Sequence, residues 1–310
     1  MTSRYETNIG LQPARIKAVL DAPRPAWMDR LKKRDIHFVG IGSSYFAARL
    51  SEWLWRTHVG PRAWAVSSFD FCRASQPVRR GDAVVVFSHR GTKSFSVEAA
   101  ARARKVGAVV IGITGKDSPW KGLHHRLETT EQEDTGGFTK SLTAALVWVV
   151  RWIDDKKLTA AVRKTAKRIP TEQKFYKVGP RTDLVLLGDA IREWTAREAG
   201  LKAQETAWLN ARAFGLEEFL HGPRCSVGPG SVVIGFSGPS EKRWADVRTF
   251  LKTVQVPFQE LKSSGAAGWL THLFLGQLLA LQACKSLGHD PDSLRTEDVR
   301  YRLARAKLKL

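Results

Sequence analysis

The chain has 310 residues, 43% of them hydrophobic, which is enough for one large core or two cores of ordinary size. Its formal net charge is +20, but no basic stretch is interleaved with stacking aromatic residues, which argues against a nucleic-acid track and favours a solvated basic surface. The widely spaced cysteines Cys72, Cys225 and Cys284 argue against a zinc motif or a disulfide framework and suit a cytoplasmic protein.

The sequence also argues against export and membrane insertion. The first ten residues, MTSRYETNIG, lack the apolar core of a signal peptide. Residues 264–284 carry no formal charge, but Thr271, His272, Gln277 and Gln282 interrupt them, so we expect a buried or interface helix there.

The first half of the chain alternates short apolar runs with helical patterns. Residues 1–22 are predicted to form an amphipathic lead-in helix, and a proline-containing loop follows. Strands that are apolar throughout, separated by helices, predict a parallel sheet covered on both faces. We expect the strands at 35–40, 63–67, 83–87, 108–114 and 125–128, and the helices at 45–57, 94–106 and 139–153.

The same order of elements restarts in the second half. The charged segment 154–168, followed by Pro170, is predicted to be a linker. We expect strands at 183–187, 211–214, 231–236 and 257–261, a helix through 198–205, and a last long helix at 269–287. The predicted fold class is therefore α/β, with two tandem three-layer α/β/α domains and parallel sheets. The domains are expected at 23–160 and at 170–310, the second with a C-terminal tail.

Two loops at the carboxyl ends of predicted strands are suited to an anion. Residues 40–44 (GIGSS) follow the first strand, and residues 88–93 (SHRGTK) follow the third. Each offers hydroxyls and the N-terminus of a helix, and the second adds two cations. An ordinary helix N-cap would explain one such loop, but two together favour an anion site. The residues predicted to contact the anion are Gly42, Ser43, Ser44, Ser88, His89, Arg90 and Lys93.

A second cluster lies between residues 198 and 223. Glu198, Lys202 and Glu205 are spaced i, i+4 and i+7, so they fall on one stripe of a helix that is otherwise suited to burial. Buried charges are costly unless they are paired, so the stripe indicates either a core ion pair or a catalytic site. The turn at His221 adds a titratable ring, which is either an ordinary turn histidine or an acid–base group.

These motifs resemble the SIS (sugar isomerase) domain family, and specifically the isomerase half of glutamine–fructose-6-phosphate aminotransferase, along nearly the whole chain. Residues 42–45 resemble that family's Gly-Thr-Ser-Tyr, and residues 88–91 its Ser-Gln-Ser-Gly. Residues 139–143 resemble Ser-Thr-Lys-Ala-Phe-Thr, and residues 290–295 resemble the closing Asp-x-Asp-x-Pro-Arg. The charged stripe followed at fixed spacing by His-Gly-Pro is the most specific match.

The resemblance implies two SIS domains, a homodimer and a phosphorylated hexose or amino sugar as substrate, with no metal or other cofactor. The family's phosphate-binding hydroxyls fall on Ser43, Ser44 and Ser88. Its glutamate that shuttles a proton between sugar C1 and C2 falls on Glu205. Its ring-opening histidine, donated by the neighbouring subunit, falls on His221. Lys202 and Glu198 match the charged partners of that helix, and Lys202 is predicted to act in catalysis. Glu198, together with Arg295 of the closing motif, is predicted to contact the substrate.

The chain departs from the family pattern at three places. No glutaminase domain precedes this region, and Thr2 stands where that domain has its nucleophilic cysteine, so glutamine is not the expected source of ammonia. Arg90 and Lys93 replace small hydroxyl residues of the phosphate loop, where they either clamp the phosphate or remain solvated. Val299 occupies the place of the family's C-terminal lysine, which argues against amine transfer through a lysine imine.

The function that follows from these features is a deaminating isomerase that converts glucosamine 6-phosphate to fructose 6-phosphate and ammonia. One alternative is a phosphosugar isomerase that handles no nitrogen. Another is a non-catalytic sugar-phosphate-binding regulator. No nucleic-acid or membrane partner is expected.

Overall fold

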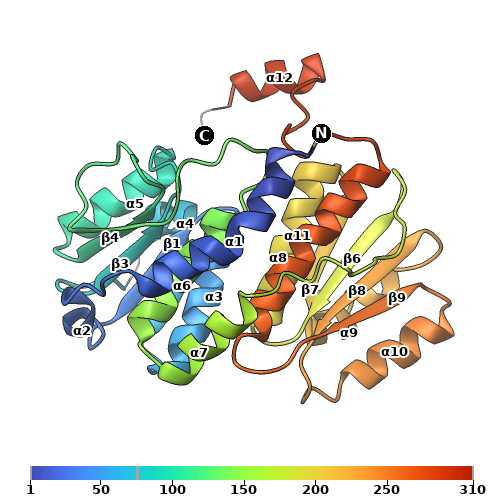
Figure 1. The fold of residues 1–310 in the computed structure, drawn as a ribbon, viewed down its shortest axis with the longest axis horizontal. Helices are drawn as coiled ribbons and strands as arrows, with labels where there is room; N and C mark the ends of the chain where they lie inside the picture. Colours follow the sequence, from blue (N-terminus) through green and yellow to red (C-terminus); the bar gives the residue numbers. More distant parts are fainter. Residues whose placement is uncertain (1, 75–76, 309–310) are drawn as a thin grey trace. The chain divides into compact units, whose positions relative to one another are not determined.

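The computed structural model describes residues 2–74 and 77–308. The chain divides into two compact units, each built on a parallel sheet with helices on both faces (Figure 1). The amino-terminal unit is formed mainly by Leu11–Glu133 and Phe138–Arg163. The carboxy-terminal unit is formed mainly by Lys164–Arg305, and the short segment Asp134–Gly137 also belongs to it. The predicted α/β class with parallel sheets is confirmed, whereas the assignment of two tandem SIS domains stays a prediction.

The sheet of the amino-terminal unit has the strand order β2-β1-β3-β4-β5, and neighbouring strands are parallel. Both β1 and β3 are buried along their whole length, as expected for apolar strands covered on both faces. The strands are β1 (Ile36–Gly40), β2 (Ala63–Ser67), β3 (Ala83–Phe87), β4 (Val109–Thr114) and β5 (His125–Glu128).

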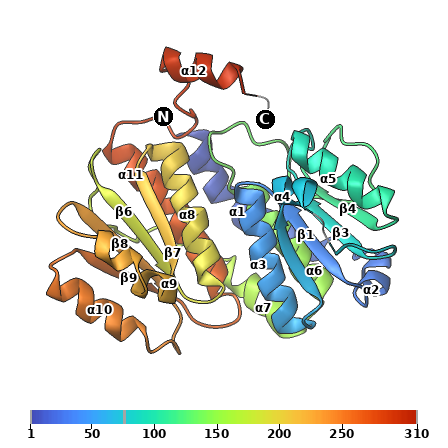
Figure 2. The ribbon, with the colours of Figure 1, turned by 180° about the vertical axis from the view of Figure 1, so that it is seen from behind.

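Helices cover both faces of this sheet. On one face α4 and α5 pack their small and aromatic side chains against valines of β1 and β3. On the other face α3 and α6 lie against each other (Figure 2). An edge contact between Trp55 and Trp152 joins these two helices. The helices of this half are α1 (Arg4–Asp21), α2 (Trp27–Leu31), α3 (Ser43–His58), α4 (Ser68–Arg73), α5 (Ser94–Lys105), α6 (Lys140–Ile153) and α7 (Lys156–Thr165).

The carboxy-terminal unit repeats this plan with the strand order β7-β6-β8-β9. In both sheets the first strand lies between the second and the third, which is the order of doubly wound folds that bind ligands where the strand order reverses. The strands are β6 (Asp183–Gly188), β7 (Asn210–Gly215), β8 (Ser231–Ser237) and β9 (Phe258–Lys262).

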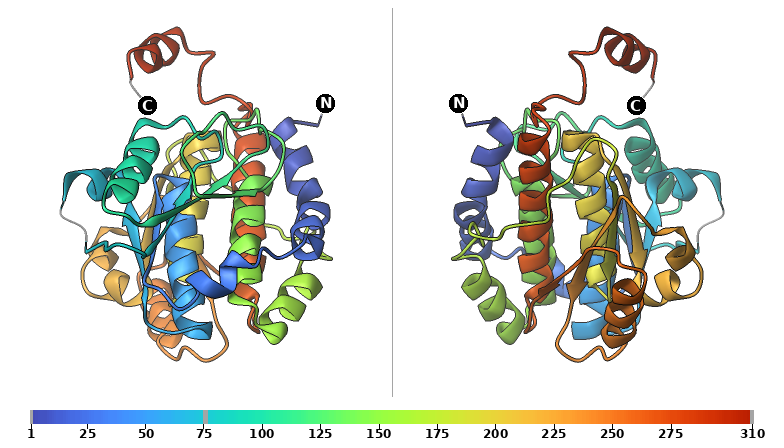
Figure 3. Two further views of the ribbon diagram at one scale, coloured as in Figure 1. Left: turned by 90° about the vertical axis from the view of Figure 1, so that its left-hand side faces the viewer. Right: turned by 90° about the vertical axis from the view of Figure 1, so that its right-hand side faces the viewer.

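The paired helices α8 and α11 cover one face of this second sheet, and α9 and α10 cover the other. The last helix, α12, buries none of its side chains and projects from the rest of its unit in both views of Figure 3. The helices are α8 (Arg192–Ala207), α9 (Leu216–Leu220), the 3-10 helix η1 (Pro223–Ser226), α10 (Trp244–Thr253), α11 (Gly268–Ser286) and α12 (Val299–Ala306).

The predicted linker at 154–168 contains the boundary between the two compact units, at Arg163 and Lys164, but much of it is helical. That segment contains α7, an amphipathic helix that buries Leu158 and Val162. The many lysines and arginines around this apolar pair favoured a linker over a helix in the sequence analysis. The i, i+4 spacing of the pair is nevertheless typical of a helix that packs against the protein on one side. Helices α4, α10 and α12 were also not predicted from the sequence.

Most of the uncharged segment 264–284 lies in α11, where most of the side chains are buried in the protein. Within residues 2–74 and 77–308, no helix combines the length and the apolarity that crossing a membrane requires.

The first strand of each unit ends at a glycine that the next helix requires. A Cβ atom at Gly40 would overlap the backbone oxygen of Ser44, and one at Gly188 would overlap the backbone oxygen of Arg192. Without a side chain at these positions, α3 and α8 can begin directly above the strand ends, which places their N-termini at the ligand-binding edge of each sheet.

We predict that Gly40→Ala lowers the free energy of unfolding by about 2–3 kcal/mol, because α3 must shift to admit the methyl group. The matched control is Gly10→Ala in α1, where a Cβ atom meets nothing within 4 Å. The control should stabilise the protein by about 0.5–1 kcal/mol through helix propensity. Urea denaturation measures both variants, and equal stabilities would contradict the predicted role of Gly40.

Candidate active site

The two predicted anion loops meet in one pocket of the amino-terminal unit. Ser43 and Ser44 form the first turn of α3, and Ser88 follows β3. The Ser88 side chain is buried, and its Oγ has no hydrogen-bond partner among the described residues. A buried hydroxyl without a partner costs about 1–3 kcal/mol, which an oxygen of a bound anion would recover. The pocket is lined by Ser43, Ser44, Ala47, Phe87, Ser88, His89, Ile113, Thr129, Phe138, Ser141, Leu142 and Ala145.

Gly42 has the backbone role that the loop requires. Its φ of 58° lies in the left-handed region, which a glycine adopts without the strain that a side chain would add. It stands immediately before α3, so it turns the chain from β1 into the first helical turn.

The ring of His89 lines this pocket, but the protein engages both of its nitrogens. Nε2 accepts a hydrogen bond of 3.1 Å from the backbone N–H of Glu133, and Nδ1 lies 3.4 Å from the Thr129 hydroxyl. Burial, assisted by the positive charges of Arg90 and Lys140, lowers the pKa of His89 to about 4. His89 is therefore a neutral ring that holds two segments together. Because both ring nitrogens are engaged, only the ring carbons of His89 remain for its predicted contact with the ligand.

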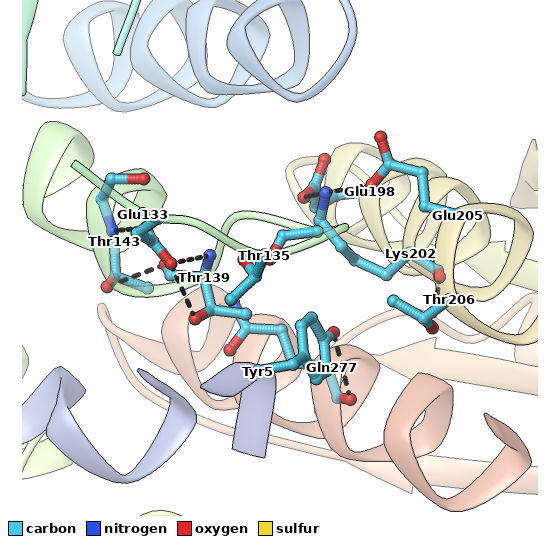
Figure 4. Close-up of polar contacts among 12 residues, drawn as sticks. Tyr5, Glu133, Thr135, Thr139, Thr143, Glu198, Lys202, Glu205, Thr206 and Gln277 are labelled. Atoms are coloured by element: carbon cyan, nitrogen blue, oxygen red, sulfur yellow. Dashed lines mark hydrogen bonds and ion pairs between the residues drawn. The ribbon is translucent and has the colours of Figure 1, made fainter. Parts of the chain in front are cut away.

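The carboxylate of Glu133 caps the N-terminus of α6. It accepts hydrogen bonds from the backbone N–H groups of Ser141, at 2.7 Å, and Thr139, at 3.1 Å (Figure 4). This carboxylate fills the position that an anion takes at a free helix N-terminus. The α3 turn and Ser88 are thus left as the anion-binding part of the pocket. Sequence reasoning missed this cap, because Glu133 is seven residues before Lys140, the first residue of α6.

The two cations of the second loop lie at its exposed end. The guanidinium carbon of Arg90 is 5.6 Å from the ring centroid of Phe138, one of the pocket-lining residues. Lys93 is exposed and immediately precedes α5. Neither side chain lines the pocket itself, so their contact with a ligand stays a prediction.

The charged stripe of α8 forms a buried ion-pair triad in the carboxy-terminal unit (Figure 4). The Lys202 side chain is 1% exposed, and its Nζ lies 2.6 Å from Glu205 Oε2 and 3.3 Å from Glu198 Oε1. Burial alone lowers the pKa of Lys202, but the two carboxylates outweigh burial and raise it above the ordinary lysine value. Lys202 is therefore a permanent cation.

The three members of this triad differ in their access to solvent. Glu198 is buried with the lysine, whereas the side chain of Glu205 remains 28% exposed. Gly137 allows the backbone of residues 134–137 to approach Lys202 and Glu205 closely. A Cβ atom at this position would lie 3.5 Å from Glu205 Oε2 and 3.1 Å from Lys202 Cδ. Glu205 is thus the member of the triad that can meet a substrate.

Glu205 lines a pocket of about 280 Å³ together with the predicted substrate residue Arg295. Arg295 lies over the rings of Trp208 and Tyr301, at 5.1 and 4.1 Å from guanidinium carbon to ring centroid. Sequence reasoning missed the two aromatic residues because they belong to different elements, the end of α8 and α12. The lining residues are Gln204, Glu205, Trp208, Leu209, Leu294, Arg295 and Tyr301.

His221 lies apart from that pocket, at the end of α9. Its side chain is 74% exposed, and Nδ1 is 2.9 Å from the backbone oxygen and 3.3 Å from the carboxylate of Glu217. It does not line the Glu205 pocket. An exposed ring is suited to reaching a site on another subunit, and its donation across a dimer interface stays a prediction.

The loop after β6 carries its own charge pair. Asp189 is buried and accepts hydrogen bonds from Arg192, the backbone of Gly238 and the indole of Trp244, at 3.0, 2.8 and 2.6 Å. In the carboxy-terminal unit, the hydrogen-bonded carboxylate of Asp189 therefore occupies the place at which the amino-terminal unit presents serine hydroxyls. Over the described part of the chain, histidine, cysteine, aspartate and glutamate side chains form no group of three or more that could hold a metal ion.

Comparison with known proteins confirms the predicted resemblance. Residues 31–150 match the model of the SIS domain. The chain is 26% identical over 219 residues to glutamine–fructose-6-phosphate aminotransferase of Encephalitozoon cuniculi, covering 62% of this chain. It is 23% identical over 346 residues to the enzyme of the same name from Pyrobaculum aerophilum, covering 94% of this chain. The matches span only 31% and 54% of the lengths of these two relatives.

Solved structures share the fold over almost the whole chain. The C-terminal domain of the Francisella tularensis aminotransferase superposes with a TM-score of 0.81 at 15% identity, covering 94% of this chain and 98% of that one. A glucosamine-6-phosphate deaminase from Thermotoga maritima gives 0.73 at 20%, covering 94% and 97%. A tagatose-6-phosphate ketose/aldose isomerase from Escherichia coli gives 0.75 at 18%, covering 94% and 95%. Residues 31–150 thus match the SIS domain, and the chain shares its fold with the C-terminal domain of the aminotransferase.

We predict that Lys202→Met lowers the free energy of unfolding by about 3–5 kcal/mol, because it leaves the buried Glu198 carboxylate without its cation. Lys17→Met removes an ion pair whose lysine side chain is 73% exposed, and it should cost less than about 1 kcal/mol. Chemical denaturation compares the variants. A loss at position 202 no larger than at position 17 would contradict the structural role of the triad.

The buried histidines predict a loss of stability in acid. The pKa of His89 is about 4 in the folded protein, and burial also lowers that of His272 to about 4, whereas the ordinary value is 6.5. Between these values the unfolded chain binds more protons, so the free energy of unfolding falls as pH decreases from 6.5 to 4, by about 3 kcal/mol for each ring.

The His89→Gln variant isolates this effect. Its unfolding free energy, measured by denaturation at pH values from 7 to 4, should fall about 3 kcal/mol less than that of the wild type. Parallel curves for His89→Gln and the wild type would contradict the assignment of His89 as a neutral structural ring.

Proposed function

Because residues 31–150 carry an SIS domain, we propose that this protein is a sugar-phosphate aldose–ketose isomerase and deaminase. It converts glucosamine 6-phosphate to fructose 6-phosphate and ammonia. The observation that carries the proposal is Glu205, a partly exposed carboxylate fixed by a buried lysine on the wall of a pocket. Moving a proton between adjacent carbons requires one such base in a fixed position.

Binding of the phosphate is assigned to Ser43, Ser44 and Ser88. The unpartnered buried hydroxyl of Ser88 and the first turn of α3 support this assignment. Hydroxyls and the N-terminus of a helix hold phosphate without requiring a cation at the same point. Arg90 and Lys93, exposed at the edge of the loop, attract the dianion and strengthen its binding.

Glu205 takes the proton from C2 of the open-chain amino sugar and returns it to C1. This transfer produces an imine at C2, which water hydrolyses to the ketose and ammonia. His221 opens the sugar ring of the neighbouring subunit in a homodimer, a role supported by its exposed position at the end of α9. Lys202 and Glu198 act by positioning Glu205.

Two alternative functions give results different from deamination in the assay proposed below. A nitrogen-free phosphosugar isomerase would use the same carboxylate, and the fold is shared with a tagatose-6-phosphate isomerase as well as with a glucosamine-6-phosphate deaminase. A regulator that only binds sugar phosphates would be stabilised by them without turnover. Deamination is preferred because both curated relatives matched by sequence are named as aminotransferases of fructose 6-phosphate, which favours chemistry that handles nitrogen.

The test incubates the purified protein with glucosamine 6-phosphate and, separately, with a panel of nitrogen-free hexose 6-phosphates, scoring ammonia and ketose independently. We predict ammonia and ketose in equal amounts from the amino sugar. Glu205→Gln should lower kcat by about 10²–10⁴-fold, the usual contribution of a general base. Glu193→Gln, on the same helix but outside the pocket, should leave kcat unchanged.

Other results redirect or overturn the proposal. Ketose formed only from nitrogen-free substrates would favour the plain isomerase. Thermal stabilisation by sugar phosphates without any turnover would favour the regulator. Full activity of Glu205→Gln would overturn the assigned mechanism.

A further inference from the structure

The pocket that contains Glu205 also contains an unusual arginine. Arg295 and Glu205 both line this space of about 280 Å³, but they form no ion pair with each other. No carboxylate in the described part of the chain lies within ion-pair distance of Arg295, although the positive charge of Arg295 helps to lower the pKa of Asp298. The hydrogen bond that its guanidinium donates goes from Nη1 to the Tyr301 hydroxyl, at 2.9 Å. A general base and a guanidinium thus share one pocket without neutralising each other.

Two aromatic rings hold the guanidinium in place. Its carbon lies 4.1 Å from the ring centroid of Tyr301 and 5.1 Å from that of Trp208. Stacking of this kind engages the faces of the guanidinium and leaves N–H groups on its edge for an oxygen acceptor. The arrangement therefore favours an oxygen that carries or develops negative charge.

The backbone around this pocket is also unusual. Trp208 and Arg295 have φ values of 54° and 59°, in the left-handed region that residues with side chains rarely adopt. Each such residue costs roughly 1 kcal/mol or more, and they concentrate at functional sites. Both of these left-handed residues line the pocket that contains the proposed base, Glu205.

Proton transfer from a sugar carbon needs a cation at the carbonyl oxygen as well as a base. Lys202 is enclosed in the protein and engaged by Glu198 and Glu205, so its ammonium serves the carboxylates. The terminal lysine expected from the resemblance is replaced by Val299, whose side chain is exposed. Arg295 is the cation that remains at the pocket of Glu205.

We propose that Arg295 is the electrophile of the reaction, donating hydrogen bonds from its guanidinium to the oxygen on sugar C1 while Glu205 moves the proton. This inference rests on the proposed function. Glu205 removes the C2 proton, the electrons of the C2–H bond form the C1–C2 double bond, and the carbonyl electrons move onto O1. Arg295 stabilises the resulting oxyanion. Protonation of C1 by Glu205 and transfer of the proton from the C2 heteroatom to O1 complete the isomerisation without any oxidant or further reactant.

The experiment compares the wild type with Arg295→Met and Arg295→Lys on whichever sugar phosphate the wild type turns over. We expect Arg295→Met to lower kcat by about 10²–10³-fold, the usual loss when one oxyanion donor is removed, with a much smaller change in KM. Arg295→Lys keeps the charge but loses the stacked fork, so its kcat should be intermediate. Arg300→Met, whose arginine side chain is 86% exposed, is the matched control and should retain wild-type kcat.

A second measurement separates an electrophile from a merely structural residue. A phosphorylated aldonohydroxamate, which imitates the enediolate, should lose about 10²-fold or more in affinity for Arg295→Met, whereas the sugar phosphate itself loses little. Infrared difference spectra of the bound open-chain aldose should show the C1 carbonyl band shifted to lower frequency in the wild type and not in Arg295→Met. The unfolding midpoints of the variants establish that they are folded, and Arg295→Lys carries the test if Arg295→Met does not fold.

The outcomes distinguish this inference from the proposed function. Wild-type kcat in Arg295→Met, together with an inactive Glu205→Gln, would overturn the role of Arg295 and leave the function intact. Equal losses of affinity for substrate and hydroxamate would also overturn it, since they indicate ground-state binding only. A wild type that turns over no sugar phosphate would overturn the function and this inference together.

Discussion

The buried ammonium of Lys202 is the constraint on which the carboxy-terminal unit depends. A cation that is 1% exposed is stable there only because Glu198 and Glu205 lie beside it. The same interaction fixes the carboxylate of Glu205 on one side and leaves its other side towards the pocket. The small residues of α8 support this arrangement, because Ala199 and Ala203 let the helix pack closely against the sheet and α11. The ion pairs that make burial of Lys202 possible are thus the same ones that position the Glu205 carboxylate.

The two units use one fold for different chemistry. In both, a glycine at the end of the first strand allows the next helix to begin at the ligand-binding edge of the sheet. In the amino-terminal unit this edge presents Ser43, Ser44 and the unpartnered Ser88. In the carboxy-terminal unit, Asp189 and Arg192 satisfy each other at the corresponding place. The loop after β1 thus presents serine hydroxyls where the loop after β6 presents a satisfied ion pair, although Ser237 at the end of β8 also has a buried hydroxyl without a partner among the described residues.

Neutral histidine is the second structural device of this strongly basic chain. His89 joins the loop after β3 to Glu133, and Glu133 in turn caps α6, so one hydrogen-bonded path holds three pocket-forming segments. The ring can accept from a backbone N–H only while it is uncharged, and burial lowers its pKa to about 4. Arg90 and Lys140 reinforce this state. The positive charge that surrounds the pocket therefore helps to keep its central histidine neutral.

The sequence by itself determined the parallel α/β class, most strand and helix positions, and the buried stripe of α8, because periodicity reports burial directly. It also predicted the serine loops, since strand ends in such folds carry ligand sites. Only the tertiary structure decided that His89 is a locked ring, that residues 156–165 form a docked helix, and that Arg295 lies between Trp208 and Tyr301. These features join residues that are distant in sequence. The amino-acid sequence specifies the type of each side chain, but it does not show which other side chain it contacts in the folded protein.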